Sequence, residues 1–325
     1  MSELVDFTNC ERLNKSYSGA NGKKICIVYN DQRYMLKFNA PAKLNKDMKY
    51  ANSCVSEYLG CHIFDSIGIS VQETILGRYN AGDKERLVVA CKDFTSPGII
   101  LQDFASLKNQ IIDSERNGYG TELADIEETL VNQTVLPVEE IQKRFWDVFI
   151  VDALVGNWDR HNGNWGILYN EVDNTSKLAP VFDCGSSMYP QAGKNEIEKV
   201  FNNVSELHTR VYNRPQSAIT INNKRINYFD FISSLENQYC NDALRRIVPK
   251  INLDIINKII DETPIIDDFQ KQFYKLMLKE RKNIILDKSL EKLNSKEQTL
   301  EGKINIALEK TSKESIGHIK TEPER

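Results

Sequence analysis

Two runs of alternating apolar and polar residues near the N-terminus predict a β-hairpin. KICIVY (24–29) and RYMLKF (33–38) are rich in β-branched and aromatic residues, and the Asn-Asp-Gln segment at 30–32 is typical of a hairpin turn. In the second run the apolar side chains share one face of the strand, so Lys37 points to the opposite face.

One helix and two further strands complete the expected N-terminal part. Residues 53–67 follow helical periodicity, and strands are predicted at 71–79 and 86–91. Glu57 lies in this helix, which is apolar on both sides and is therefore expected to be buried. A buried carboxylate is costly unless it is paired, and Lys37 is a plausible partner. A purely structural ion pair is the alternative.

After Phe94 the periodicity becomes mainly helical. The longest apolar pattern covers 139–156 and ends at a glycine, and two short strands are predicted around an acidic turn, at 165–170 and 177–183. Further helices are predicted at 228–239, 252–261 and 266–287.

The expected fold class is α+β, with three parts along the chain. A small antiparallel β-lobe with one helix covers 1–93, and a larger, mainly helical lobe covers 94–287. The remaining segment, 288–325, has charges of both signs and no aromatic residue, so we expect a tail that is partly disordered.

Composition then narrows the class of protein. The 325 residues are 41% hydrophobic, enough for a sizeable core, and the formal net charge of −4 gives no basic footprint for a nucleic acid partner. No apolar run approaches the roughly 18 residues of a membrane span, and the N-terminus lacks the apolar stretch of a secretory signal peptide. Seven cysteines without a C-x-x-C pair indicate reduced thiols in a cytosolic protein.

The strongest chemical signal is the loop GNWDRHNGNWG at 156–166. Asp159 and Asn164 are five residues apart, so a turn can direct both side chains to one point. Asp159 would accept the proton of an attacking hydroxyl, and the amide oxygen of Asn164 suits Mg²⁺. Asp183, at the end of the second predicted strand, would return beside Asn164 as a second metal ligand. Two ordinary polar turns at the ends of a hairpin are the alternative.

The other polar and aromatic residues near this loop have several candidate roles. His161 is grouped with the catalytic residues, although we favour a structural role in which it bonds the backbone or Asp183. Arg160 is expected either to stabilise developing phosphate charge or to pair with a surface acid. Trp158 and Trp165 are expected to pack.

The segment SGANGKK, just before the first strand, is a candidate phosphate-binding loop. Its glycines allow backbone N–H groups to approach an anion closely, although a hairpin turn is the plainer interpretation of this segment alone. The candidate nucleotide contacts in it are Ser18, Gly19, Ala20, Asn21, Gly22 and Lys23.

Taken together, these stretches resemble the HipA-like protein kinases. The matching segments are SGANGKK, RYMLKF, the helix with Glu57, GNWDRHNGNW and LAPVFDCG, which keep the family's order across residues 16 to about 190. The segment at 218–231 is also similar. The resemblance implies a two-lobe protein-kinase-like fold and the ATP- and Mg²⁺-dependent phosphorylation of serine or threonine in proteins.

The resemblance also implies roles for individual residues. Asp159 would be the catalytic base, Lys37 would contact the α- and β-phosphates, and Glu57 would fix Lys37. Asn164 and Asp183 would hold Mg²⁺, and the loop at 18–24 would cover the phosphates. Backbone contacts to adenine would come from a short run at the end of the sheet: Val89, Cys91 and Lys92.

Two family features bear on partners and modification. Full-length HipA proteins carry an N-terminal subdomain before the phosphate loop, whereas here the loop starts near residue 18, which puts an antitoxin partner in doubt. HipA-type kinases can autophosphorylate at a serine in the phosphate loop. We therefore expect autophosphorylation at one of four serines: Ser16, Ser18, Ser312 or Ser315.

The location of the protein in the cell and the molecule that accepts the phosphoryl group each have competing interpretations. Composition indicates the cytosol, whereas one small member of the family, similar in size, implies a secreted bacterial effector that enters host cells and provokes inflammatory signalling. Phosphoinositide kinases also use a D-R-H-x-x-N loop followed by D-x-G, so a lipid or small-molecule kinase is one alternative. A non-catalytic signalling effector with a kinase-like fold is the other, although every catalytic part is present.

Overall fold

The N-terminal lobe is a six-stranded sheet that packs on one helix. The computed structural model describes residues 4–17, 23–39, 52–82, 84–112 and 116–299. The strand order is β1-β5-β6-β4-β3-β2, and every neighbouring pair is antiparallel except β1 with β5. The strands are β1 (Val5–Asp6), β2 (Arg12–Leu13), β3 (Lys24–Tyr29), β4 (Gln32–Phe38), β5 (Thr74–Ala81) and β6 (Lys84–Lys92).

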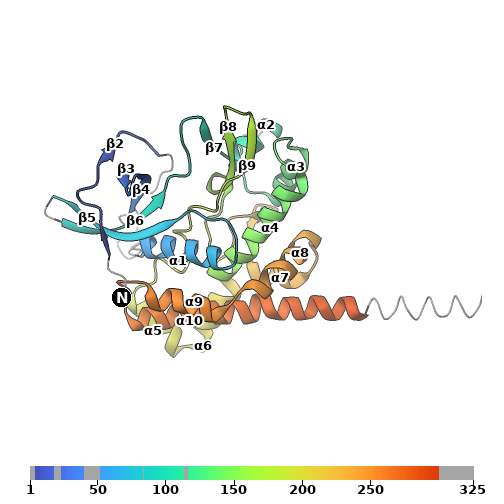
Figure 1. The fold of residues 1–325 in the computed structure, drawn as a ribbon. Helices are drawn as coiled ribbons and strands as arrows, with labels where there is room; N and C mark the ends of the chain where they lie inside the picture. The colour runs from blue at the N-terminus through green and yellow to red at the C-terminus, as the bar shows by residue number, and fades with distance from the viewer. Residues whose placement is uncertain (1–3, 18–22, 40–51, 83, 113–115, 300–325) are drawn as a thin grey trace, which may run out of the picture.

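Helix α1 (Ser53–Ser66) lies against this sheet, and Figure 1 shows it between the strands and the helices of the second lobe. One face of the sheet has its own apolar core, which includes Phe7 and Leu36. The other face packs through Val89 in a cluster with Cys54 of α1. The helix is therefore buried on both sides, as its sequence pattern predicts.

The second lobe is mainly helical. Its centre is the long helix α4 (Val138–Val155), and beside it lies an antiparallel sheet of β7 (Ile99–Asp103), β8 (Gly166–Asn170) and β9 (Thr175–Leu178). A small hairpin is formed by β10 (Thr220–Ile221) and β11 (Lys224–Arg225). The other helices are α2 (Phe104–Ile111), α3 (Leu123–Asn132), α5 (Lys194–Asn202), α6 (Val204–His208), α7 (Tyr228–Ser234), α8 (Gln238–Ile247), α9 (Leu253–Glu262) and α10 (Asp268–Arg281).

A continuous apolar core joins the two lobes. It runs from Leu59 in α1 through Ile150 and Leu154 in α4 to Phe273 in α10, and none of these four side chains is exposed. Because α1 packs both into this core and against the sheet, it fixes the position of the two lobes relative to each other. The α1 side chains that face the junction between the two lobes are held in position by the same packing.

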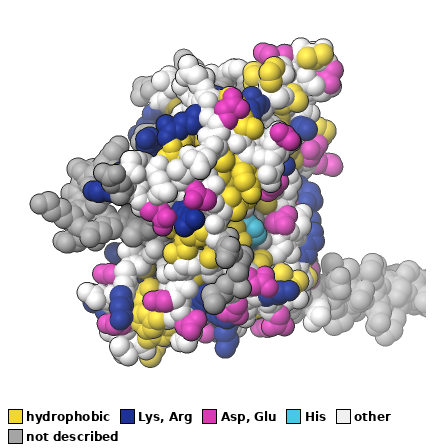
Figure 2. Space-filling view, turned by 60° about the vertical axis from the view of Figure 1, so that its left-hand side comes forward, with side chains coloured by type: hydrophobic (Ala, Val, Ile, Leu, Met, Phe, Trp, Pro, Cys, Tyr) yellow, Lys and Arg dark blue, Asp and Glu magenta, His cyan; other side chains and the backbone are white. Residues whose placement is uncertain are grey.

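The surface and the cysteines follow from the composition. On the face shown in Figure 2, basic and acidic side chains are interspersed with apolar ones, in keeping with the 42 basic and 46 acidic residues of the chain. All seven cysteines are free, which confirms the prediction of unpaired thiols, and six of them are buried. In the part of the chain that the structure describes, no helix combines the length and apolarity needed to cross a membrane.

The longest predicted elements are confirmed, but the strand predicted at 177–183 is wrong in part. It ends at Leu178 as β9. Pro180 has no N–H to donate to a strand ladder, and Asp183 adopts a left-handed backbone conformation with φ of 57°. The segment that leads to Asp183 is therefore a loop.

The helix predicted at 228–239 is also wrong in part. It ends at Ser234, because Leu235 is left-handed with φ of 59°, and Asn237 then caps the separate helix α8. The sequence pattern does not predict α2, α3, α5 or α6, which contain between five and ten residues. Such short helices show too few turns for their periodicity to be recognised.

Short turns of other helix types occur at four places in the second lobe. Two are 3-10 turns, at Asn162–Asn164 and Val248–Lys250, and two are π turns, at Thr209–Asn213 and Lys282–Asp287.

The C-terminal tail begins as a helix. After the π turn at Lys282–Asp287, residues 288–299 are helical and extend the line of α10 in Figure 1. The disorder predicted for the end of the tail concerns residues 300–325, which lie outside the described residues.

Replacing Leu59 with alanine tests the packing of α1. We expect the free energy of unfolding to fall by about 2–5 kcal/mol, because the fully buried side chain leaves a cavity between the two lobes. Urea denaturation measures the change. Ile255→Ala on α9 is the control: its side chain is 48% exposed, so the change should stay within about 0.5 kcal/mol. Equal effects of the two substitutions would contradict the packing described here.

Candidate active site

The loop that follows α4 is held by the last turns of that helix. Gly156 ends α4 in a left-handed conformation, and a β-carbon there would lie 3.0 Å from the side chain of Pro215. Asn157 Nδ2 donates to Asp152 Oδ1 at 2.9 Å, and Asn157 Oδ1 accepts from the N–H of Asp159 at 3.0 Å. The carboxylate predicted to act as the base is therefore carried by a braced turn.

Arg160 is the residue that connects this loop to the segment before Asp183. It is buried, and its Nε donates to Asp152 Oδ2 at 3.0 Å. Its Nη1 donates to the carbonyl of Asn164 at 2.9 Å and also to the carbonyl of Phe182. Both predictions for Arg160 are therefore wrong: it pairs with a buried acid on α4, and it brings the two candidate metal ligands together through their backbones.

Lys37 joins the sheet, α1 and the helical lobe at one point. Its Nζ lies 2.9 Å from Glu57 Oε2 and 2.9 Å from Asp183 Oδ1. Glu57 is almost fully buried, and its second oxygen accepts from the N–H of Cys184 at 3.0 Å. The predicted pairing of Lys37 with Glu57 is confirmed. The contact with Asp183 brings this pair next to one of the two predicted metal ligands.

The charges at this junction change the proton affinities of its members. Burial opposes the charge on Lys37, but the carboxylates of Asp183 and Glu57 outweigh it and hold the pKa of Lys37 well above its usual value. Burial also opposes ionisation of Asp183, and the same ammonium group keeps the pKa of Asp183 below its usual value. The Lys37 ammonium group and the Asp183 carboxylate are therefore both charged at neutral pH.

Asp159 has the opposite shift. Its burial raises its pKa above the usual aspartate value, and His161 and Arg225 offset this only in part, while the negative charge of Asp183 adds to it. A carboxylate with a raised pKa is a better proton acceptor, which suits the role predicted for Asp159.

Asn164 and Asp183 offer a donor set that fits Mg²⁺. The Nδ2 of Asn164 donates to the carbonyl of Asp159 at 2.8 Å, which fixes the amide and directs its Oδ1 the other way. Asp183 uses Oδ1 for Lys37 and has a side chain that is 41% exposed. One amide oxygen and one carboxylate, with phosphate oxygens and water completing the shell, is the kind of ligand set that Mg²⁺ prefers.

His161 bonds the backbone of its own loop. Its Nδ1 accepts from the N–H of Gly163 at 3.0 Å, one of the two structural contacts expected from the sequence. Trp165 packs as predicted, with its ring stacked 4.0 Å from that of Phe104. Trp158 is partly buried.

The residues expected to contact adenine lie within the sheet. Val89, Cys91 and Lys92 are on β6, a central strand that pairs with β4 on one side and β5 on the other. The N–H of Lys92 donates to the carbonyl of Glu73, and its own carbonyl accepts from Gln72 Nε2. The adenine contacts at this segment stay a prediction.

The predicted phosphate loop falls largely outside the described residues. This applies to Ser18, Gly19, Ala20, Asn21 and Gly22. Of the two lysines that follow, Lys23 Nζ lies 5.6 Å from the ring centroid of Phe38. Lys24 pairs with Lys37 across the hairpin, and its charge helps to lower the pKa of Asp183. Sequence reasoning included Lys24 only as the last residue of the loop at 18–24, although its register opposite Lys37 follows from the hairpin.

A polar cluster that sequence reasoning missed ties the start of this loop to the end of β6. Asp93 is buried, and its Oδ2 accepts from Lys15 Nζ at 2.6 Å and from the hydroxyl of Tyr17 at 3.0 Å. Its Oδ1 accepts from the N–H and hydroxyl of Thr95. The ring of Phe94 lies 5.6 Å from that of Phe182, directly before the predicted metal ligand. No local motif marks these residues, since they meet only through tertiary structure.

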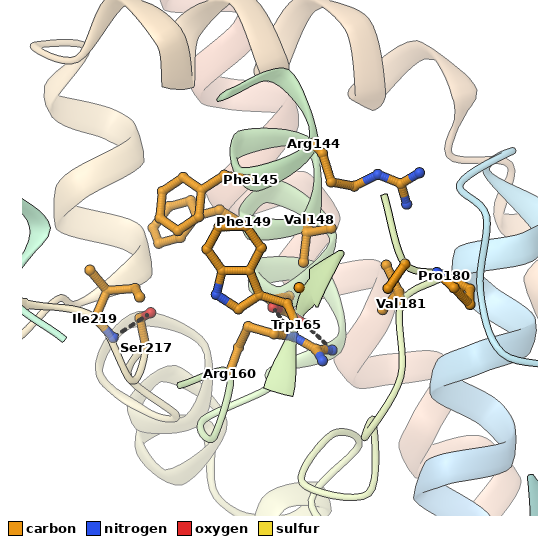
Figure 3. A pocket seen from close by; sticks show the side chains of 13 residues that line it. Arg144, Phe145, Val148, Phe149, Arg160, Trp165, Pro180, Val181, Ser217 and Ile219 are labelled. Carbon is orange, nitrogen blue, oxygen red and sulfur yellow. Dashed lines mark hydrogen bonds and ion pairs between the residues drawn. The ribbon is translucent and has the colours of Figure 1, made fainter. Parts of the chain in front are cut away.

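The loop at 156–166 packs against apolar side chains of α4. Behind it lies a cavity of about 30 Å³, and Figure 3 shows Trp165 and Arg160 of the loop facing Phe145, Val148 and Phe149 of α4. Nucleotide-sized ligands occupy pockets of roughly 300–1,000 Å³, so this cavity is not the nucleotide site. Beside this cavity, Asn157 and Arg160 provide the polar connections from the loop to Asp152 of α4.

A sheet lobe and a helical lobe that meet around a lysine–glutamate pair, with a D-R-H-x-x-N loop beside them, define a protein-kinase-like fold. The chain belongs to the HipA-like C-terminal domain family, whose model matches residues 15–263.

Relatives with names and structures support this family assignment. The serine/threonine-protein kinase CtkA of Helicobacter pylori (strain J99) is 46% identical over 285 residues, which are 87% of this chain and 86% of that protein. A crystal structure of a Helicobacter pylori proinflammatory kinase CtkA matches with a TM-score of 0.85 and 44% identity, covering 90% of this chain and 98% of that one. HipA of Shewanella oneidensis MR-1, solved with HipB and operator DNA, matches with a TM-score of 0.50 over 86% of this chain and 67% of its own; at 15% identity this likeness concerns the fold alone.

Arg160→Met tests the buried connection. We expect the free energy of unfolding to fall by about 3–5 kcal/mol, because Asp152 would remain buried without its partner. The double variant Arg160→Met, Asp152→Leu should recover part of this loss. Lys143→Met removes a largely exposed partner of Asp147 and should cost only about 0–1 kcal/mol. If denaturation shows the Arg160 variant as stable as the Lys143 variant, the connection is not structural.

Proposed function

We propose that this protein is a serine/threonine protein kinase that uses ATP and Mg²⁺. The observation that carries the proposal is the position of Lys37, whose Nζ lies 2.9 Å from Glu57 Oε2 and 2.9 Å from Asp183 Oδ1. Three segments far apart in the sequence thus contribute one cation and two carboxylates at the junction of the lobes, with Asp159 nearby. The 46% identity with the serine/threonine-protein kinase CtkA supports the same function.

The chain's own residues divide the work of phosphoryl transfer. Asp159 accepts the proton of a serine or threonine hydroxyl and orients its oxygen for attack, a task for which its raised pKa is suited. Lys37 contacts the α- and β-phosphates, and Glu57 holds its ammonium group in place. His161, bonded to the backbone of Gly163, keeps the loop in the shape that presents Asp159.

The same site would bind the two proposed cofactors, ATP and Mg²⁺. Asn164 and Asp183 would hold Mg²⁺, which when bound neutralises charge on the phosphate oxygens. The segment at 18–24 would cover the phosphates. Backbone contacts to the adenine ring would come from the end of β6, at Val89, Cys91 and Lys92. The protein substrate carries the acceptor hydroxyl, and no antitoxin partner is part of this proposal.

The biological role that we propose is that of a bacterial effector. The related crystal structure is described as that of a proinflammatory kinase, and by that relation this protein would be released from the bacterium and provoke inflammatory signalling in host cells. An inflammatory response of host cells that persists unchanged with Asp159→Asn would instead assign the signal to contact rather than to catalysis.

Asp159→Asn tests the enzyme assignment. Asparagine cannot accept the proton of the attacking hydroxyl, so phosphate transfer to a basic protein should fall by about 10²–10⁴-fold, while ATP binding measured by calorimetry changes little. Asp173→Asn, in the exposed turn between β8 and β9, is the matched control and should keep full activity. Label from ATP that enters lipid vesicles and never protein would replace the protein-kinase proposal with a lipid kinase.

Autophosphorylation is tested by mapping phosphopeptides after incubation with Mg-ATP. We expect phosphate on Ser16, Ser18, Ser312 or Ser315, and none in the Asp159→Asn variant. Of these, Ser16 is the one within the described residues, and it lies between Lys15 and Tyr17, both bonded to Asp93. A wild-type sample without any modified serine would remove autophosphorylation from the proposal.

A further inference from the structure

The segment at 116–122, just before α3, is held against the catalytic loop by buried donors. Asn162 Nδ2 donates to the carbonyls of Gly118 and Gly120, each at 2.8 Å. Lys108, which is fully buried, also donates to the carbonyl of Gly120 at 2.8 Å. A β-carbon on Gly118 would lie 1.8 Å from the carbonyl oxygen of Ala105, so only glycine allows this close approach. The backbone on both sides of residue 119 is therefore fixed.

The residue that this fixed backbone presents is an exposed aromatic. Tyr119 is 53% exposed, although both its neighbours are pinned to the catalytic loop. Its ring lies edge-on to that of His161, with 6.3 Å between centroids. His161 uses Nδ1 to accept from Gly163, so its Nε2 carries the proton and is a donor. An aromatic face and a donor thus lie together two residues from Asp159.

The β10–β11 hairpin is also held in place. The carboxylate of Glu122, at the start of α3, accepts from the hydroxyl of Thr220 at 2.9 Å and from the N–H of Asn223 at 3.1 Å. It accepts from the N–H of Asn222 as well. One carboxylate therefore fixes both the first strand of the hairpin and its turn.

This hairpin positions a basic side chain close to the proposed catalytic base. Arg225 on β11 is exposed, and its Nη1 donates to the carbonyl of Trp158, the residue before Asp159, at 2.9 Å. Within the described residues this is the only hydrogen bond of its side chain, and the side chain forms no ion pair with a carboxylate. A guanidinium group has five N–H donors in a planar fork that matches a carboxylate, so most of its binding capacity is unused.

We propose that Tyr119, His161 and Arg225 form the acceptor-recognition surface of the kinase, and that it selects protein segments in which the serine or threonine lies within a few residues of an aspartate or glutamate. The inference rests on the proposed function. Arg225 would bind the acidic side chain as a bidentate pair, because its charge is opposite to that of the acid and its guanidinium group forms no ion pair within the described residues. Tyr119 would contact an apolar part of the same segment.

The test uses the full chain, Mg-ATP and peptides with a single serine in a neutral background. Each flanking position carries aspartate, glutamine or arginine in turn. For the best position we expect kcat/KM to be about tenfold higher with aspartate than with glutamine, the size of one charge-assisted pair. Arg225→Gln should reduce this ratio to near one, and Arg225→Glu should shift the preference to the arginine peptides.

Two control variants separate recognition from structure. Lys224→Gln removes the neighbouring cation, whose side chain points to the opposite face of the strand, and should keep the wild-type ratio. Tyr119→Ala should raise the KM for the peptide several-fold without changing the KM for ATP, whereas Tyr119→Phe should behave like the wild type. Thermal melting of each variant confirms that it is folded.

The outcomes distinguish this inference from the function on which it rests. Transfer to all peptides without an aspartate preference overturns the inference and leaves the kinase assignment intact. An equal loss for aspartate and glutamine peptides in Arg225→Gln also overturns it, because Arg225 would then act only by positioning Asp159 through Trp158. No transfer from ATP to any peptide or to the protein's own serines would remove the kinase function and the inference together.

Discussion

The junction between the lobes depends on one ammonium group held between two carboxylates. Glu57 is almost fully buried, and Asp183 lies next to it on a different lobe, so without a cation the two negative charges would repel each other. Lys37 provides that cation from the sheet. Lys37 therefore connects the sheet, α1 and the loop that contains Asp183 at one point, supported by the N–H of Cys184, while the apolar packing of α1 sets the relative position of the lobes.

A second buried cation repeats this arrangement inside the helical lobe. Arg160 pairs with Asp152 and donates to the carbonyls of Asn164 and Phe182. The residues proposed for catalysis thus lie between two cations that connect separate segments of backbone. Because both cations are surrounded by packed side chains, the more exposed carboxylates, Asp159 and Asp183, are held in place without themselves being deeply buried.

Local patterns were sufficient for part of this architecture. The β3–β4 hairpin, the helix that carries Glu57 and its pairing with Lys37 could be predicted, because alternation and burial are encoded within short segments. The role of Arg160 could not, since its partner Asp152 lies in a helix whose apolar pattern gives no sign of a buried acid. The place of β6 between β4 and β5 could not be predicted either, because it is set by pairing between distant strands, and the adenine contacts assigned to Val89 and Cys91 stay a prediction.

The left-handed backbone at Asp183 limits how this position can change over evolutionary time. Aspartate and asparagine adopt such a conformation more readily than other residues with a side chain. Glutamate would keep the negative charge but would strain the backbone, whereas asparagine would keep the backbone but lose the charge that balances Lys37. The single substitution best tolerated by the local fold is therefore one that weakens the proposed chemistry, and a lineage that loses phosphoryl transfer could pass through it while its shape survives.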